Sequence, residues 1–584
     1  MEHSFEELLN DPELLLRNEE KYKECDMNVT TYFKTPIRHQ EKTRELDERL
    51  MEDLEMTGDK NIYNNLLKDE NLCYKSQLVS DMCKTYSTDK KFLKQTQGVI
   101  NSVKTLKDKE ETNRHTQNIF DTWKELKEVQ QFKERFQYMT WDMFSFVNEN
   151  QFLLSLLSYY NLSSPVMTLI GPIFMLFVPF FIIQMMGRPL TFDTYLGILK
   201  QALRQNSIFK LFFNFRNSTL QEKAYLFLSV LLYLIQIYQN INYCIQFYNN
   251  IQKIIKTFGD IQTFSRQTCD KIRCLENVCG NKSKYIGFYN TMISYKTKLE
   301  LLDKKLNIHK PHSIVFQLNQ IGPMMRNYYE LYYDDDIHDV IMYSVGFNTY
   351  YDFICDLKNM INTNKLSKSK FVSKGGTKIS GNYYLPHIDI EHVCNDVRIK
   401  NSIITGANGS GKTTILKSCV LNLILSQQFG FGCYKSASIQ LYDQFHSYLN
   451  IPDTSGRDSL FQAEARQCKE ILDKIENNKN KRHFCIFDEL YSGTNPEDAV
   501  DAGLIFLKYI NSMKNVDFMI TTHYFDLCEK MKETTKVTLK HMETHMNEES
   551  GLALYKYKLK EGLCKMRAGK SVLASMNYPK EMFK

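Results

Sequence analysis

The sequence predicts two architectures in one chain of 584 residues: an α/β C-terminal domain with a mostly parallel sheet, preceded by a mainly α-helical region that contains a hydrophobic hairpin. Short apolar runs that end in polar residues predict buried strands at 402–405, 483–489 and 517–522. Apolar residues at helical spacing, with few glycines and prolines, predict helices through much of 41–150 and 246–371. A long uncharged apolar run between these two stretches predicts the hairpin.

A glycine-rich segment joins the first strand to a helical pattern at 414–425. The sequence from 405 to 414 reads TGANGSGKTT, which contains the pattern G-x-x-x-x-G-K-[ST]. Glycines let backbone N–H groups close around an anionic phosphate, and the helix N-terminus adds a partial positive charge there. A glycine-rich turn with an incidental lysine is the alternative, but the flanking strand and helix favour a nucleotide-binding loop. The residues that we expect to hold the nucleotide are Gly406, Asn408, Gly409, Ser410, Gly411, Lys412, Thr413 and Thr414.

Two more strand ends carry polar side chains that suit hydrolysis. Asp488 and Glu489 end the strand that begins at His483, about 75 residues after the loop. We expect Asp488 and the Thr413 hydroxyl to bind Mg²⁺, and Glu489 to act on the attacking water. His523 follows the next strand, where open α/β sheets bind ligands, and it would sense the γ-phosphate or hold that water. An acidic strand end that arose by chance is the alternative for the carboxylate pair.

The C-terminal segment, about residues 372–584, resembles the ATPase domain of the MutS proteins, the mismatch-repair branch of the ABC-type ATPases. The loop resembles that family's T-G-P-N-x-x-G-K-[ST]-T, with Ala407 in place of the proline. Further similarities, in chain order, are FGFGCYKSA at 429–437, SGRDSLFQAE at 455–464, DELYSGT at 488–494 and THYFDL at 522–527. The pair Asn395–Asp396 matches one that the family places near the nucleotide.

The resemblance implies a dimer that binds ATP with Mg²⁺ in composite sites. In the family, a serine matching Ser459 approaches the γ-phosphate held by the opposite subunit; here Leu460 replaces the threonine that usually follows it. The expected catalytic residues are therefore Glu489, His523 and Ser459. The resemblance also implies a homodimer on double-stranded DNA, mismatched or branched, in DNA repair. An ATPase that has lost activity and is retained for its fold is a further alternative, which the intact Lys412 and the carboxylate pair oppose.

The rest of the chain divides by composition into four segments. A polar segment at 1–40 precedes the first half of a helical lever at 41–150, and the second half follows at 246–371. Between them, 151–245 is a hydrophobic insertion and a candidate transmembrane segment, in the position of the family's DNA clamp. The 40 or so residues before the lever are too few for the family's mismatch-recognition and connector domains. Hence the alternative function is a membrane-anchored, ATP-driven scaffold or mechanochemical switch that does not bind DNA.

Two apolar runs within the insertion favour a membrane. Residues 166–186 carry no charge, and as one helix they would span about 31 Å, the thickness of a bilayer core. Residues 224–238 form a second, shorter run, and two crossings would return both lever halves to one side. The loop between the runs opposes the positive-inside tendency, because it carries Arg188, Lys200, Arg204, Lys210 and Arg216 against Asp193 and Glu222. A buried hairpin, or one lying along the membrane surface, is the alternative.

Composition bears on three further properties of the chain: nucleic-acid binding, zinc binding and secretion. A net charge of only +6 gives no global basic character that would argue for nucleic acid. The 15 cysteines are scattered, and Cys269, Cys274 and Cys279 are too widely spaced for a zinc knuckle. Acidic residues crowd the first eleven positions, so we expect no signal peptide. The predicted location is intracellular, in the cytoplasm or nucleus, with membrane association as an added possibility.

Overall fold

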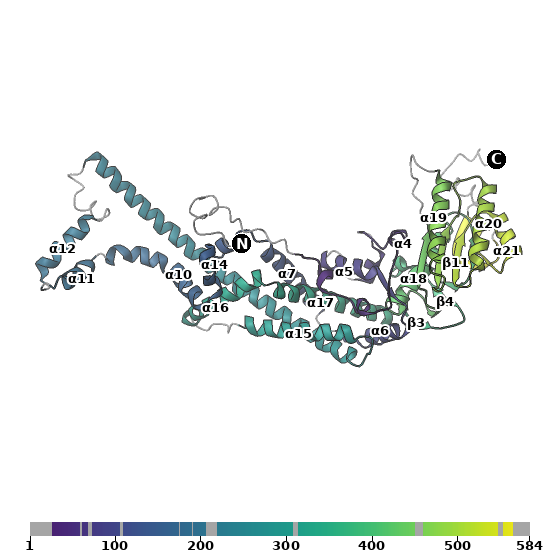
Figure 1. Cartoon of the computed structure of the whole chain (residues 1–584), viewed down its shortest axis with the longest axis horizontal. Helices are drawn as coiled ribbons and strands as arrows, with labels where there is room; N and C mark the ends of the chain where they lie inside the picture. Colours follow the sequence, from purple (N-terminus) through teal and green to yellow (C-terminus); the bar gives the residue numbers. More distant parts are fainter. Residues whose placement is uncertain are drawn as a thin grey trace. The chain divides into compact units, whose positions relative to one another are not determined.

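The computed structural model describes residues 26–58, 61–67, 73–105, 109–174, 176–187, 189, 191–205, 219–307, 314–449, 459–546 and 553–563 (Figure 1). They form two compact units, each assembled from separate parts of the chain. The helical unit comprises Met1–Met27, Arg114–Arg266 and Lys298–Val340. The mixed unit comprises Asn28–Asn113, Gln267–Thr297 and Ile341–Lys584. The mainly helical N-terminal region and the α/β C-terminal region expected from the sequence are confirmed.

The helical unit is built from long helices with short connections. Stacked aromatic rings fill its core: Phe132 lies with its ring centroid 3.9 Å from that of Tyr332, and Trp123 Nε1 donates to His338 Nδ1 at 2.9 Å. The helices that lie in it wholly or in part are α7 (Lys109–Lys127), α8 (Phe132–Arg135), η3 (Asp142–Phe144), α9 (Phe146–Glu149), α10 (Gln151–Phe174), α11 (Val178–Met185), α12 (Phe192–Gln205), α14 (Leu220–Cys279), α15 (Ile286–Leu306), α16 (Ile314–Tyr333) and α17 (Asp335–Asn362).

The run 166–186, predicted as a helix that Pro172 and Pro179 would kink, is divided between two helices. Helix α10 ends at Phe174 and α11 begins at Val178, with Pro179 in its first turn. A proline there is tolerated because the first-turn N–H groups have no intrahelical partner, whereas inside a longer helix it would remove a hydrogen bond. The second apolar run, 224–238, lies within the 60-residue helix α14. Helices α10 and α14 each contain a segment long and apolar enough to cross a membrane, at Gln151–Gly171 and within Lys223–Cys279.

A six-stranded sheet organises the C-terminal part of the mixed unit. Its order is β13-β12-β6-β11-β10-β9, and β9, β10, β11, β6 and β12 pair in parallel, while β13 pairs antiparallel with β12 at the edge. The strands are β6 (Ser402–Thr405), β9 (Gln444–Tyr448), β10 (His483–Asp488), β11 (Val516–Thr521), β12 (Thr538–Met546) and β13 (Ala553–Glu561). The associated helices are α18 (Lys412–Gln428), α19 (Leu460–Glu476), α20 (Pro496–Ser512) and α21 (Phe525–Thr534). Figure 1 shows these helices beside the green and yellow strands.

Beside this sheet, the mixed unit holds a five-stranded sheet of order β5-β4-β8-β3-β7. Its strands are β3 (Ser367–Phe371), β4 (Thr377–Asn382), β5 (Asn395–Ile399), β7 (Phe431–Gly432) and β8 (Ser436–Ile439), with the short helix η4 (Leu385–His387) after β4. The N-terminal part adds α3 (Val29–Tyr32), η1 (Pro36–His39), β1 (Thr43–Glu45), α4 (Glu48–Asp53), η2 (Ile62–Leu66), α5 (Cys73–Cys83), β2 (Thr85–Ser87) and α6 (Lys90–Ser102).

The pairing of β1 with β2 departs from the helical pattern expected in 41–150. Both strands are three residues long, too short for a period of two to be distinguished from helical spacing. Tertiary packing stabilises them: the Tyr86 ring of β2 lies 5.2 Å from that of Phe445, and its hydroxyl donates to Asp443 O at 2.6 Å. The N-terminal segment therefore packs directly on the C-terminal sheet within one unit.

Candidate functional site

The loop between β6 and α18 has the backbone conformation that its glycines permit. Gly409 and Gly411 have φ values of 80° and 91°, in the left-handed region, and Gly411 is the residue that caps α18. Space is short as well, because a Cβ on Gly411 would lie 3.2 Å from the ring of Tyr557. The loop thus presents main-chain groups at the start of a buried helix, where the helix dipole favours an anion.

Lys412, the first residue of α18, is buried and points back into the loop. Its Nζ donates to Gly406 O and Asn408 Oδ1, each at 3.1 Å, and lies 3.4 Å from Glu489 Oε1. An ammonium held by neutral oxygens and one carboxylate can exchange those partners for phosphate oxygens without moving far. The ammonium therefore lies where a phosphate bound by the loop would meet it.

Asp488, the last residue of β10, is held between two hydroxyls. Thr413 Oγ1 donates to Asp488 Oδ2 at 2.6 Å, and the hydroxyl of Thr521, its register partner on β11, donates to the other oxygen. Within the residues that the structure describes, no group of three or more His, Cys, Asp or Glu side chains could hold a metal by itself. Mg²⁺ keeps waters and takes one or two carboxylates with substrate phosphates, so a carboxylate beside a threonine hydroxyl fits it.

Glu489 follows directly, in a left-handed backbone conformation (φ 51°) that is uncommon for a residue with a side chain. Its Oε1 faces Lys412, and its Oε2 lies 3.7 Å from His523 Nδ1. The nearby His523 ring, and then the Lys412 ammonium, lower the pKa of the Glu489 carboxyl, against the opposing effect of partial burial. The carboxylate therefore stays ionised at neutral pH and is available to accept a proton.

Ser459 lies apart from this cluster in its hydrogen bonds. It caps α19, accepting from Gln462 N at 3.3 Å, while its own N–H donates to Gln462 Oε1 at 3.1 Å. Its carbonyl also accepts from Ala463 N at 3.1 Å in the first turn of the helix, and the residue is exposed. The structure thus brings together Lys412, Thr413, Asp488 and Glu489 with His523, and leaves Ser459 at an exposed helix start.

Three contributors were not assigned roles from the sequence. Glu464 on α19 is 2% exposed and accepts from Ser492 N, Ser492 Oγ and Gly493 N at 3.0–3.2 Å, so it fixes the turn after Glu489. Thr521 orients Asp488, as described above. Tyr557 on β13 covers Gly411, and Asn395 binds this strand by donating to Tyr557 O at 3.0 Å. Glu464 was part of a recognised motif, but only the fold shows which turn it binds.

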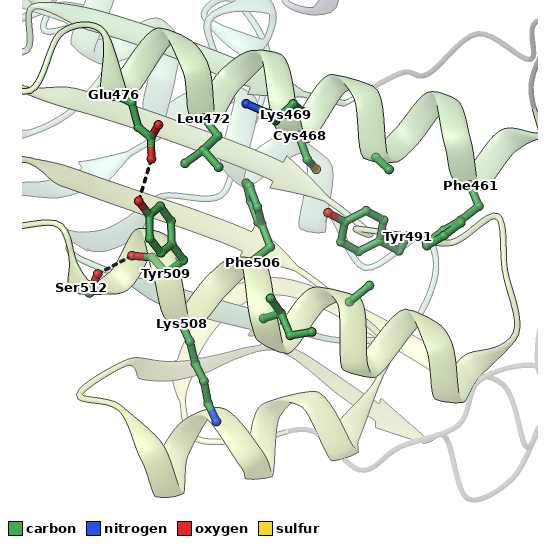
Figure 2. A pocket seen from close by; sticks show the side chains of 13 residues that line it. Phe461, Cys468, Lys469, Leu472, Glu476, Tyr491, Phe506, Lys508, Tyr509 and Ser512 are labelled. Atoms are coloured by element: carbon green, nitrogen blue, oxygen red, sulfur yellow. Dashed lines mark hydrogen bonds between the residues drawn. The ribbon is translucent and has the colours of Figure 1, made fainter.

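A separate cavity of about 1050 Å³ opens between α19 and α20, and Figure 2 shows its side chains. Phe461, Leu472, Tyr491 and Phe506 line it, and at its edge Tyr509 OH donates to Glu476 Oε1 at 2.6 Å. The lining is mainly apolar. Lys469 and Lys508 also line it, and none of the predicted site residues does.

The fold and the loop define the class: a mixed α/β domain with a glycine-rich turn between a parallel strand and a buried helix. The sequence model of MutS domain V matches residues 402–584. The chain is also similar to the DNA mismatch repair protein MutS of Bacteroides fragilis (28% identical over 202 residues), Aquifex pyrophilus (29% over 196) and Streptococcus equi subsp. equi (28% over 182).

These matches show that residues 402–584 correspond to domain V of the MutS proteins. They cover 33%, 33% and 31% of this chain and 23%, 22% and 21% of the respective relatives. The chain thus shares less than a quarter of the length of the proteins that it matches. The resemblance expected from the sequence motifs is confirmed for this domain.

Proposed function

We propose that the chain is an ATPase that binds ATP with Mg²⁺ in the loop of residues 406–414 and hydrolyses it. The observation that carries the proposal is the convergence of an ammonium, a threonine hydroxyl and two carboxylates at one edge of the sheet. Lys412 would bind the β- and γ-phosphates, and Thr413 with Asp488 would hold the metal. Glu489 would accept the proton of the attacking water, and His523 would orient that carboxylate.

Substitution of Glu489 by Gln tests the chemical step. The variant keeps the size of the side chain but cannot accept a proton, so we expect ATP binding to persist while turnover falls by roughly 100-fold or more. Glu497→Gln, on the exposed first turn of α20, is the matched control and should leave turnover unchanged. Normal turnover in the Glu489 variant would exclude this residue as the base.

The proposed assembly is a homodimer in which Ser459 of one subunit completes the site of the other. Its support is the exposure of Ser459 at a helix start whose dipole would favour an anion from outside the subunit. Mixing two inactive variants tests it. A Lys412→Ala subunit retains its serine and a Ser459→Arg subunit retains its loop, so an equal mixture should recover up to about a quarter of wild-type turnover. A mixture as inactive as its components argues against composite sites.

The proposed partner of the dimer is double-stranded DNA, mismatched or branched, within an intracellular repair process. The support for DNA is the name of the relatives, each called a DNA mismatch repair protein. The support for an intracellular location is that the cysteines whose side chains the structure describes are free thiols. Turnover measured with homoduplex, heteroduplex and branched DNA at low and high salt is the direct test. Turnover that ignores all three would favour the alternative of a membrane-anchored scaffold, which the exposed apolar helices support.

A further inference from the structure

Helices α10 and α14 form a hairpin that leaves the helical unit and returns to it. At its base, α10 packs on α16 so closely that a Cβ on Gly322 would lie 2.0 Å from Ser155 Oγ. On the returning helix, Asn250 Nδ2 donates to Arg135 O at 2.8 Å, and the ring of the adjacent Phe136 lies 4.9 Å from that of Tyr328 on α16. Both ends of the hairpin are therefore fixed in the same part of this unit.

Beyond this base, the described apolar side chains of α10 and α14 are exposed or half-buried, whereas Pro179 and Ile183 of α11 are buried. Among the described residues, Ser158 is the last buried side chain of α10 and Phe247 is the first of α14. The two segments long enough to cross a membrane are 11% and 0% buried, so neither is the core helix of a water-soluble unit. The exposed apolar side chains between these points include Val166, Met167, Leu169, Phe174, Phe177, Phe181, Met185, Tyr225, Phe227, Leu228, Leu232, Leu234, Tyr238 and Ile245. Figure 1 shows both helices extending away from the rest of their unit.

The bare surface is not a single stripe. At about 100° per residue, the exposed apolar positions of α14 between Tyr225 and Tyr248 cover roughly two-thirds of the helix circumference. The remaining sector carries Tyr233 and Asn240, and it faces α10. A second protein copy would cover one face of each helix, whereas a lipid solvent covers all the surface that the other helix leaves free. The distribution favours lipid.

Several polar groups within the hairpin are paired inside it, although Gln236, Gln239 and Gln246 of α14 are exposed. Tyr233 OH donates to Thr168 O at 2.7 Å, and Asn240 Nδ2 donates to Thr168 Oγ1 at 2.6 Å. The hydroxyls of Thr168 and Ser229 each donate to the carbonyl four residues earlier in their own helix. A bilayer core contains no water to satisfy polar groups, so such internal pairing is what a lipid-embedded hairpin requires.

The lengths of the two helices and the positions of their charged residues also agree with a lipid environment. The sequence contains no charged residue in 150–187 or in 224–252, and Lys223 and Lys253 bracket the second run. Helix α10 is about 36 Å long at 1.5 Å per residue, and the uncharged run of α14 is about 43 Å long. Both exceed the roughly 30 Å of a bilayer's hydrocarbon core. Tyrosines at positions 159, 160, 243 and 248 lie toward the base, where a membrane interface would favour them.

We infer that a lipid bilayer covers this hairpin, with α10 and the first half of α14 crossing it, so that the protein is an integral membrane protein. The inference goes beyond ATP hydrolysis and does not depend on it. The full chain, expressed with membranes, should stay in the pellet after carbonate extraction and float with phosphatidylcholine vesicles. A protein released by carbonate, and a monomer in detergent-free buffer, would overturn the inference; a soluble oligomer would assign the surface to a second copy instead.

A double substitution on α14 and a single control substitution on α15 separate lipid from water around the hairpin. Leu232 on α14 is 57% exposed, and Leu301 on α15, outside the hairpin, is 60% exposed. In water, lysine at either position should have little effect. In a bilayer, Leu228→Lys with Leu232→Lys should lower the vesicle-bound fraction roughly tenfold or more, whereas Leu301→Lys should not change it. Equal binding by all variants would refute lipid contact at α14.

Crossing can be distinguished from lying on the surface. In sealed membranes, an impermeant maleimide should reach a cysteine at Asp142, near the base, and should reach one at Gln201 on α12 only from the opposite side. Labelling is counted as one added gel shift over the wild-type protein. Labelling of both positions from the same side would overturn the two crossings and leave a hairpin embedded in one leaflet. The positive-inside tendency of the basic loop at 188–216 agrees with that second arrangement, because it would keep the loop on the side of the proposed ATPase domain.

Discussion

Substitution of Glu464 tests how the domain holds the turn that follows Glu489. This carboxylate on α19 is buried and accepts three hydrogen bonds from the turn that follows Glu489: Ser492 N at 3.1 Å, Ser492 Oγ at 3.0 Å and Gly493 N at 3.2 Å. Hydrogen bonds to a charged group contribute about 1.5–3 kcal/mol each, and the two amides would be left unpaired in the Ala variant. We therefore expect Glu464→Ala to lower the free energy of opening this turn by about 3–5 kcal/mol.

Hydrogen exchange measures that change where it occurs, in the intact chain. A loss of about 3 kcal/mol corresponds to exchange more than 100-fold faster for the amides of Ser492 and Gly493, since each 1.4 kcal/mol is tenfold. The Glu464→Gln variant keeps one side-chain oxygen as an acceptor, but its NH₂ group would face one of the N–H groups of the turn. This substitution should therefore lower the free energy of opening the turn by about 1–3 kcal/mol. Glu470→Ala, exposed on the same helix, is the control and should stay within about 0.5 kcal/mol. Unchanged exchange in the Ala variant would refute the role of Glu464.

Three further predictions follow from single contacts. His523→Gln removes the largest cause of the lowered Glu489 pKa; because a lowered carboxyl pKa keeps the base ionised until the pH falls through it, the acid limb of kcat/KM against pH should move to higher pH, and an unmoved limb would contradict the pairing. Lys271→Met leaves Asp352 buried without its ammonium, now 3.0 Å away, and should cost about 3–5 kcal/mol by hydrogen exchange of α14, whereas adding Asp352→Leu should recover most of it. Gly430→Ala combines a φ of 83° with a Cβ placed 2.4 Å from a buried glutamine side chain of α6, and a thermal melt should show a loss of about 2 kcal/mol or more.

The glycine-rich loop and the strand ends were predictable because each is set by local chemistry. The segment Ser402–Thr405 was predicted as a strand and is one, and the strands ending at Asp488 and Thr521 lie within one residue of the expected bounds. Apolar runs of this length, closed by polar residues, have few alternative structures in a buried parallel sheet. Because these strands are parallel, the side chains at their carboxyl ends lie at the same edge of the sheet.

Contacts between distant segments could not be predicted in this way. Nothing in the sequence around Thr43–Glu45 and Thr85–Ser87 identifies them as partners, since their pairing depends on how the N-terminal segment packs. The break of the apolar run after Phe174 is similar, because a proline kinks or ends a helix according to what can satisfy the freed carbonyl. Glu464 had a recognisable motif, yet its partners lie across the fold at Ser492 and Gly493.

Helix α18 links the glycine-rich loop to the N-terminal segment of the chain, because each of its two ends contacts one of them. Its first residue, Lys412, lies in the loop, while at its other end Gln428 Nε2 donates to Met82 O, Cys83 O and Thr85 O at 2.9–3.3 Å. Gln427 likewise donates to Ser87 O at 3.3 Å and to Tyr442 O at 2.9 Å. In the proposed ATPase, a shift of the α18 N-terminus on phosphate binding would be transmitted along this close-packed helix to the N-terminal segment that its C-terminus holds.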